Sequence, residues 1–216
     1  MKKYQSGFTL VEIAIVLVII GLLLGGVLKG QALIDSAKVK ALANDMKAVQ
    51  TAYYGYQDKF RAVPGDDAAA ITHLGTTVNN ITIVNATASN GLINTGTWIG
   101  DATPVASNES ALFWMHTRAA GLMTGNAGSG EATNSVGGKL GITSTSAIST
   151  TTLTGTKFVC SGAIDGTLAL QLDTMLDDGA PNTGSVQATA GAAVVTAAAA
   201  ATTYAASTAY TVCMSF

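Results

Sequence analysis

The pattern of apolar positions divides the first 60 residues into two halves. From Phe8 to Leu28 the one charged residue is Glu12, and such a helix would span roughly 30 Å, the thickness of a bilayer's hydrocarbon core. Farther on, apolar residues recur at alternating spacings of three and four, at Val39, Leu42, Met46, Val49, Tyr53, Tyr56 and Phe60. The pattern predicts one long helix over residues 8–60, with a membrane half and a half that packs a globular domain on its stripe.

The rest of the chain predicts an α+β domain. Pro64-Gly65-Asp66 should end the long helix, and a second helix is expected from Ala111 to Ala120, capped by Asn108 or Ser110. Short strands are expected at residues 81–84, 157–160, 167–172 and 210–214, forming a small antiparallel sheet on the helix stripe. Residues 124–156 are interpreted as loop, and the Ala/Thr/Ser-rich residues 186–209 as a flexible or irregular surface loop.

Glu12 is the first candidate functional residue, because a carboxylate inside an apolar span needs a partner. The sequence has no Lys, Arg or His between Lys3 and Lys29, so a charged partner within the segment is missing. Cleavage after Gly7 would create an ammonium group on Phe8, and a neighbouring copy of the helix could bring that ammonium to Glu12. A secretory signal is disfavoured, since its apolar core is shorter and a small-residue cleavage site follows it.

These residues carry a resemblance to a known family. Lys2-Lys3, the run Gly7-Phe8-Thr9-Leu10-Val11-Glu12 and the apolar stretch behind it resemble the type IV pilin and type II secretion pseudopilin superfamily. The resemblance implies a prepilin peptidase that cuts after Gly7 and methylates Phe8, and a role for Glu12 in docking subunits into a helical filament. It implies a pilin-like fold: leader 1–7, filament-core helix 8–29, amphipathic half 30–60 and globular head 61–216.

Charge and cysteine content are consistent with an exported head domain. Lys2 and Lys3 before the apolar span place the amino end in the cytoplasm by the positive-inside bias, so the head would lie outside the inner membrane. The formal net charge is −2 and no basic patch exists, so nucleic acid is not indicated as a partner. Cys160 and Cys213 are the two cysteines, and one disulfide between them is favoured over two free thiols.

The densest acidic cluster is Asp173, Asp177 and Asp178, in a loop with Gly179 and Pro181. Its oxygen ligands could hold Ca²⁺, and some pseudopilins bind calcium in a carboxyl-terminal loop, but an Asp-Asp-Gly turn is favoured and no cofactor is expected. His116 is interpreted as a packed or surface histidine, and His73 has no evident partner. The sequence contains no catalytic motif, so an enzyme is not expected.

The sequence therefore favours a prepilin whose partners are further copies of itself, prepilin peptidase, the inner membrane and its pilus or secretion assembly machinery. The precursor would sit in a bacterial inner membrane, and the assembled form in an extracellular pilus or a periplasmic pseudopilus. A minor pilin, a pseudopilin, and a tip subunit for adhesion or DNA uptake stay open. An uncut membrane anchor is disfavoured, because it leaves Glu12 without a charged partner.

Overall fold

The computed structural model describes residues 9–148 and 153–216. The chain divides into two compact units, Met1–Ala37 and Lys38–Phe216. Helix α1 (Leu10–Phe60) contributes its first part to one unit and its second part to the other. Each unit is described by itself.

The second part of α1 is the central helix of the larger unit. Its predicted stripe is buried at Val39, Leu42, Met46, Val49, Tyr53 and Tyr56, and Phe60 is half-buried. The helix ends at Phe60. The next residue, Arg61, has a left-handed backbone (φ 56°), and its N–H donates to the carbonyl of Gln57 at 2.8 Å. The predicted long helix is confirmed from Leu10 to Phe60, including the stop before Pro64.

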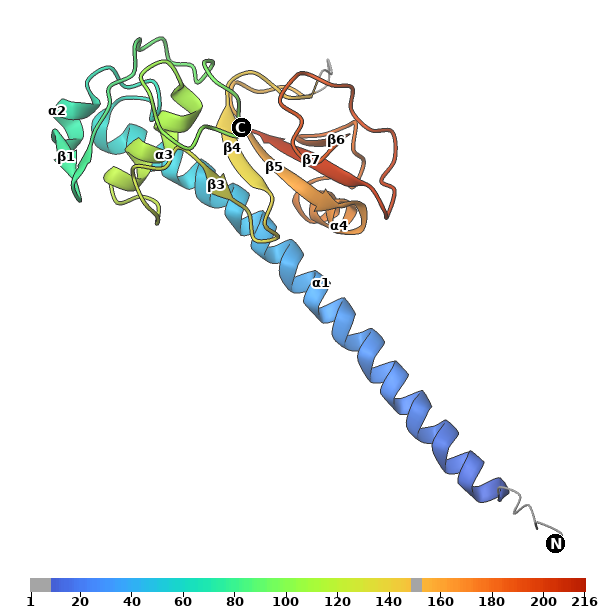
Figure 1. The fold of residues 1–216 in the computed structure, drawn as a ribbon. Helices are drawn as coiled ribbons and strands as arrows, with labels where there is room; N and C mark the ends of the chain where they lie inside the picture. The colour runs from blue at the N-terminus through green and yellow to red at the C-terminus, as the bar shows by residue number, and fades with distance from the viewer. Residues whose placement is uncertain (1–8, 149–152) are drawn as a thin grey trace, which may run out of the picture. The chain divides into compact units, whose positions relative to one another are not determined.

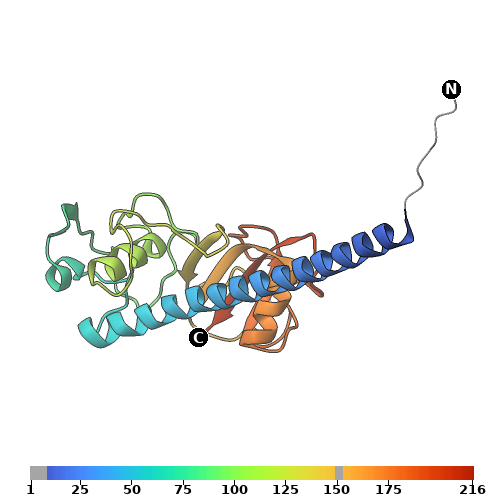
Figure 2. The same cartoon turned by 90° about the horizontal axis from the view of Figure 1, so that it is seen from below.

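A five-stranded antiparallel sheet packs on this stripe (Figure 1). Its order is β3 (Ala132–Thr133), β4 (Lys139–Thr143), β5 (Phe158–Asp165), β7 (Ala209–Ser215) and β6 (Val186–Ala190). Figure 2 views the sheet from the side that α1 and helix α4 (Gly166–Leu176) cover. The fold is α+β, as the sequence predicts, and it is consistent with a pilin fold.

Residues alternate between the two faces of the sheet, as extended strands require. Val159, Val212 and Met214 point to the core under α1, together with Phe113 and Trp114 of helix α3 (Glu109–Ala119). Phe158, Cys160 and Cys213 point the other way, toward Trp98 and Ile148. Both faces are therefore covered, one by helices and the other by long connections.

A third apolar cluster lies between α3 and a short hairpin. The hairpin pairs β1 (Thr77–Val78) with β2 (Ile81–Thr82), and helix α2 (Ala70–Leu74) precedes it. Asn79 and Asn80 form its two-residue turn with φ of 51° and 64°, the conformation of a type I′ turn, for which Asn is well suited. Asn108 caps α3 by accepting from the N–H of Ala111 at 3.0 Å, so the first of the two predicted caps is the one used.

The predicted strand at residues 167–172 is wrong, since this segment lies in α4. Alternation of Leu168, Leu170 and Leu172 favoured a strand, but the buried residues are Leu168, Ala169, Leu172 and Asp173, which follow a helical period, and Leu170 is 44% exposed. Asp165 supplies the cap, accepting from the N–H and hydroxyl of Thr167 at 3.0 and 2.7 Å. An Asp directly before the first residue of a helix-period segment is the signal that identifies this helix.

Two predicted loops also contain strands. Residues 124–156 include β3 and β4, and residues 186–209 begin with β6. These strands are two to five residues long, and four of the five residues of β6 are buried against neighbours that are distant in sequence. Composition alone gives no sign of such tertiary pairing.

Candidate functional site

The amino-terminal turn of α1 is closed by a reciprocal pair, Thr9 and Glu12. The Thr9 N–H and hydroxyl both donate to Oε2 of Glu12, at 2.9 and 2.8 Å, and the Glu12 N–H donates back to Thr9 Oγ1 at 3.3 Å. This arrangement is a capping box, in which the residue before the helix and the third residue within it satisfy each other's N–H groups. The Thr-x-x-Glu spacing was a visible signal for it, and sequence reasoning missed it.

The cap leaves Glu12 able to bind a second group. Both bonds from Thr9 end on Oε2, and among the described residues no hydrogen bond to Oε1 is found. The two bonds from Thr9 fix the orientation of the Glu12 carboxylate. The structure thus gives Glu12 a neutral partner in its own helix in addition to the charged one expected from elsewhere.

The helix surface behind the cap is apolar and uncovered. Large apolar side chains from Leu10 to Leu28 are 46–90% exposed, far more than a water-soluble surface normally shows. Within the described residues, α1 is the helix that is long and apolar enough to cross a membrane, with a mean hydropathy of 2.8 over its best window. The apolar segment requires a covering of lipid or of protein.

The proposed cleavage residues, Gly7 and Phe8, lie outside the described residues, as do Lys2 and Lys3. Their roles therefore stay predictions from the sequence.

The three carboxylates of the acidic cluster come together at the end of α4. One donor oxygen from each of Asp173, Asp177 and Asp178 lies within 4.8 Å of the others. Each carboxylate also accepts hydrogen bonds within the fold: Asp173 from the Tyr204 hydroxyl at 2.6 Å, Asp177 from the N–H of Val186 at 3.1 Å, and Asp178 from the N–H of Ala180 at 2.9 Å. Burial raises the pKa of Asp173 to about 6. These hydrogen bonds hold the loop that follows α4 in place. Carboxylate oxygens are also the type of ligand that hard cations such as Ca²⁺ prefer.

The expectation that His73 has no partner is wrong. Its Nδ1 lies 2.6 Å from Oδ2 of Asp67, which also accepts from the Tyr56 hydroxyl at 2.7 Å. Burial raises the pKa of Asp67, but the hydrogen bonds from His73 and Tyr56 outweigh it and leave that pKa lowered. Tyr56 comes from the α1 stripe, so the contact ties the segment after Pro64 to the helix.

His116 is a structural bridge within the core of the larger unit. It is fully buried; its Nδ1 accepts from the Gly65 N–H at 3.0 Å, which leaves Nε2 protonated to donate to the Val84 carbonyl at 2.8 Å. Gly65 has a φ of 93°, and a Cβ there would lie 2.4 Å from the Glu109 carbonyl, so only glycine allows this approach. His116 was predicted to be either packed or at the surface, and these contacts show that it is packed.

Stability should fall in mild acid because of His116. Burial lowers its pKa below the ordinary 6.5 or so, hence the unfolded chain takes up this proton first. The neutral histidine's contribution is complete above about pH 6.5 and is lost as the pH falls, by up to about 1.4 kcal/mol per pH unit until the folded pKa is reached. Thermal unfolding of the full chain in detergent between pH 7.5 and 5.5 measures this loss. His116→Gln should remove this loss; a loss of the same size in His116→Gln would contradict the assignment.

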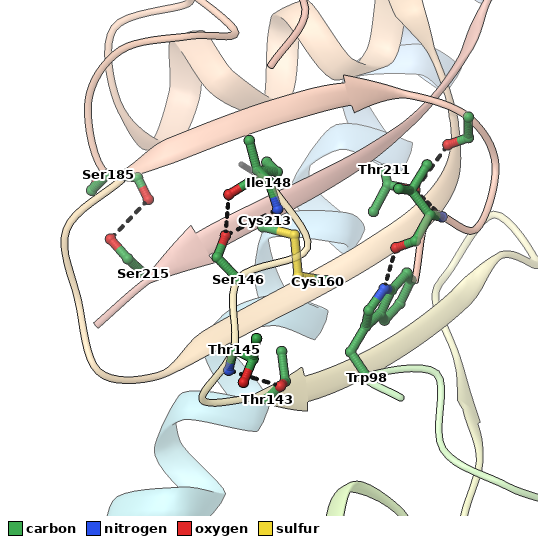
Figure 3. The surroundings of a disulfide bond; sticks show 12 residues. Trp98, Thr143, Thr145, Ser146, Ile148, Cys160, Ser185, Thr211, Cys213 and Ser215 are labelled. Atoms are coloured by element: carbon green, nitrogen blue, oxygen red, sulfur yellow. Dashed lines mark hydrogen bonds between the residues drawn. A yellow bond between two sulfur atoms is a disulfide. The ribbon is translucent and has the colours of Figure 1, made fainter. Parts of the chain in front are cut away.

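The structure joins Cys160 and Cys213 in a disulfide across the paired strands β5 and β7 (Figure 3). Both sulfurs are buried beside Trp98, whose Nε1 donates to the Val194 carbonyl at 2.5 Å, and Ile148 covers the same face. The bond closes a loop with a sequence separation of 53 residues. It therefore links β5, the central strand of the sheet, to β7, the last strand in chain order.

Removing this bridge should destabilise the larger unit by about 2–4 kcal/mol. The chain-entropy model gives about 4 kcal/mol for a loop of this length, and measured losses are often smaller. The double variant Cys160→Ala/Cys213→Ala should therefore unfold at lower denaturant concentration than the wild type. The matched control is wild type with reductant added after folding, where the buried bond should persist; equal midpoints for wild type and double variant would refute the prediction.

Comparison with known families gives one match, at the amino-terminal end. A family model described as the prokaryotic N-terminal methylation motif matches residues 2–28, and this motif is the signature of type IV pilins and pseudopilins. No curated protein and no solved structure matches the chain. The motif covers the capping box and the apolar half of α1, and so supports a pilin-type or pseudopilin-type precursor.

Proposed function

We propose that this chain is the precursor of a structural filament subunit, cleaved after Gly7, methylated on Phe8 and assembled through its amino-terminal helix. The observation that carries the proposal is the methylation motif at residues 2–28 joined to an uncovered apolar helix surface. The methylation motif supports processing by prepilin peptidase. The apolar surface serves first in the inner membrane and then in a filament of like helices, while the head lies on the periplasmic side.

Glu12 sets the register of assembly in this proposal. Its Oε2 is held by Thr9, and Oε1 is presented to the Phe8 ammonium of a neighbouring subunit. A carboxylate enclosed among apolar helices without a partner is strongly disfavoured, so subunits that dock out of register are rejected. The pair thus selects one helical arrangement from many that the apolar surface alone would permit.

The test is the intact mass of the protein in sheared surface filaments. A mass that begins at Phe8, about 14 Da heavier for one methyl group, is the expected result. A further deficit of about 2 Da reports the Cys160–Cys213 bond. An uncut mass that begins at Met1, in a strain with active prepilin peptidase, would refute the proposal.

The same experiment separates the pilus subunit from its nearest alternative. Processed protein that stays in the inner membrane and is missing from filaments would identify a minor pilin or a secretion pseudopilin. Abundance in the filaments identifies a major pilin.

A further inference from the structure

One face of the second part of α1 is exposed to solvent and lies opposite the buried stripe. Its exposed residues follow helical spacings of four and three: Lys40, Asn44, Lys47, Thr51 and Tyr54. The ammonium groups of Lys40 and Lys47 form no ion pair and no hydrogen bond within the described part of the chain. The proposed role of the apolar half of α1 leaves this face without a function.

Tyr54 gives this face an aromatic side chain that is already held in place. Tyr54 is 51% exposed, and its ring makes edge contacts with the rings of Tyr53 and Phe216 at centroid distances of 5.4 and 5.8 Å. A tyrosine fixed in this way loses little conformational entropy on binding, which is one reason why tyrosine is frequent in protein interfaces. The exposed α1 face therefore combines positive charge with an oriented apolar ring.

The outer face of α4 has the opposite charge. Leu170 and Met175 are 44% and 45% exposed on it, and the exposed carboxylates of Asp177 and Asp178 follow directly after the helix. The helix itself contains no basic residue. Its carboxyl end also carries the negative end of the helix dipole, which adds to the negative potential there. The outer α4 face therefore combines apolar side chains with negative charge.

The head supplies no cation to this end of α4. Residues 61–216 contain nine acidic and four basic side chains, and Asp177 and Asp178 form no ion pair with any described residue. Each of the four basic side chains has a partner elsewhere: Lys139 with Glu131, Arg61 with Asp58, and Lys157 and Arg118 with backbone carbonyls. The positive charge that would match this surface has to come from outside the head.

The two faces also match in spacing. Lys47 and Tyr54 are seven residues apart on α1, and Leu170 and Asp177 are seven residues apart along α4. Seven residues are about two helical turns, or about 10 Å. When the two helices lie antiparallel, Lys47 is opposite Asp177 and Tyr54 is opposite Leu170. Because Lys47 has no such partner in its own chain, this match is available only between two copies.

We propose that the exposed α1 face of one copy binds the outer α4 face of a second copy of this chain. Lys47 pairs with Asp177 and Asp178, while Tyr54 packs on Leu170. The inference rests on the proposed filament function and deepens it by naming a contact between heads. Each copy carries both faces, so the same contact can repeat from copy to copy along a filament.

The test is carbodiimide crosslinking of sheared filaments and of inner membranes from the same cells. The reagent joins a lysine amine to a carboxylate in contact with it, so the wild type should give covalent dimers that contain Lys47 joined to Asp177 or Asp178. Lys47→Arg keeps the charge but removes the amine, so filament yield should persist while the dimer falls at least about tenfold. Lys59→Arg makes the same change about 120° around the helix and should keep the wild-type dimer yield.

Charge variants test whether the contact supports assembly. Lys47→Glu should lower filament yield at least about tenfold, because it sets a further carboxylate against Asp177 and Asp178. Adding Asp177→Asn and Asp178→Asn removes that repulsion and keeps side-chain oxygens as acceptors, so part of the yield should return. Wild-type filament yield in Lys47→Glu, or filaments that give no crosslink from Lys47 to either aspartate, would overturn the proposal.

Two further outcomes separate this contact from its alternatives. If chelating Ca²⁺ removes wild-type filaments while Lys47→Glu keeps full yield, a metal ion and not a second copy neutralises the end of α4, and the proposal is overturned. Failure of the filament function itself would appear as an uncut wild-type chain or as missing filaments. The membrane sample then decides, since absence of the Lys47 crosslink there would overturn the contact between copies as well.

Discussion

Gly7→Val should abolish processing, leaving the chain at full precursor mass with at least about a tenfold drop in the processed fraction. The proposed cut lies after Gly7, and glycine allows close approach of the backbone to a peptidase because it has no side chain. A branched β-carbon at this position would occupy that space. The measurement is intact mass, or gel mobility, of the membrane-bound protein in cells that express active prepilin peptidase.

The control for Gly7→Val is Gly21→Ala in the same amino-terminal segment. A Cβ on Gly21 meets no atom within 4 Å, so this variant should be processed like the wild type. Efficient release of a chain that begins at Phe8 from the Gly7→Val precursor would show that the peptidase tolerates a branched side chain at position 7. That result would end the proposed requirement for glycine at this position.

Glu12→Gln should be processed normally but should assemble at least about tenfold less filament. Glutamine can occupy the third position of a capping box, so this variant keeps an acceptor for Thr9 and removes only the charge. Glu12→Ala removes both the charge and the cap. If pairing with a neighbour's ammonium drives assembly, the two variants should fail alike; filament recovered by shearing is the measurement.

The control for Glu12→Gln is Asp58→Asn, which removes a charge from an exposed position on the same helix. It should assemble like the wild type. Full filament yield from Glu12→Gln together with loss in Glu12→Ala would mean that Glu12 serves the helix cap alone, and it would remove the proposed charge pairing from the mechanism.

The amino-terminal segment could be predicted from the sequence, whereas the contact between His73 and Asp67 could not. Phe8 to Glu12 and the apolar run are contiguous, and local patterns such as Thr-x-x-Glu and membrane length are properties of neighbours in sequence. By contrast, His73 contacts Asp67, whose carboxylate also accepts from Tyr56 of α1. A sequence pattern carries no signal for that contact.

The wrong prediction of a strand at residues 167–172 has a physical cause that applies to other sequences. Leucines at every second position satisfy a strand pattern, yet Leu168, Ala169 and Leu172 also satisfy a helical one, and the longer run with an Asp cap decides for the helix. The strands β3, β4 and β6 were missed because they are runs of two to five residues within stretches rich in Gly, Ser, Thr and Ala. Pairing with neighbouring strands supplies their stability.

By itself the sequence determined the long helix, its division into apolar and amphipathic halves, the α+β class and the amino-terminal processing motif. These features depend on period, length and contiguous motifs, which the chain carries locally. Tertiary structure alone decided the order of the sheet and the buried bridge of His116. Those features bring together residues far apart in sequence, and their partners are chosen by packing and by the need to satisfy buried polar groups.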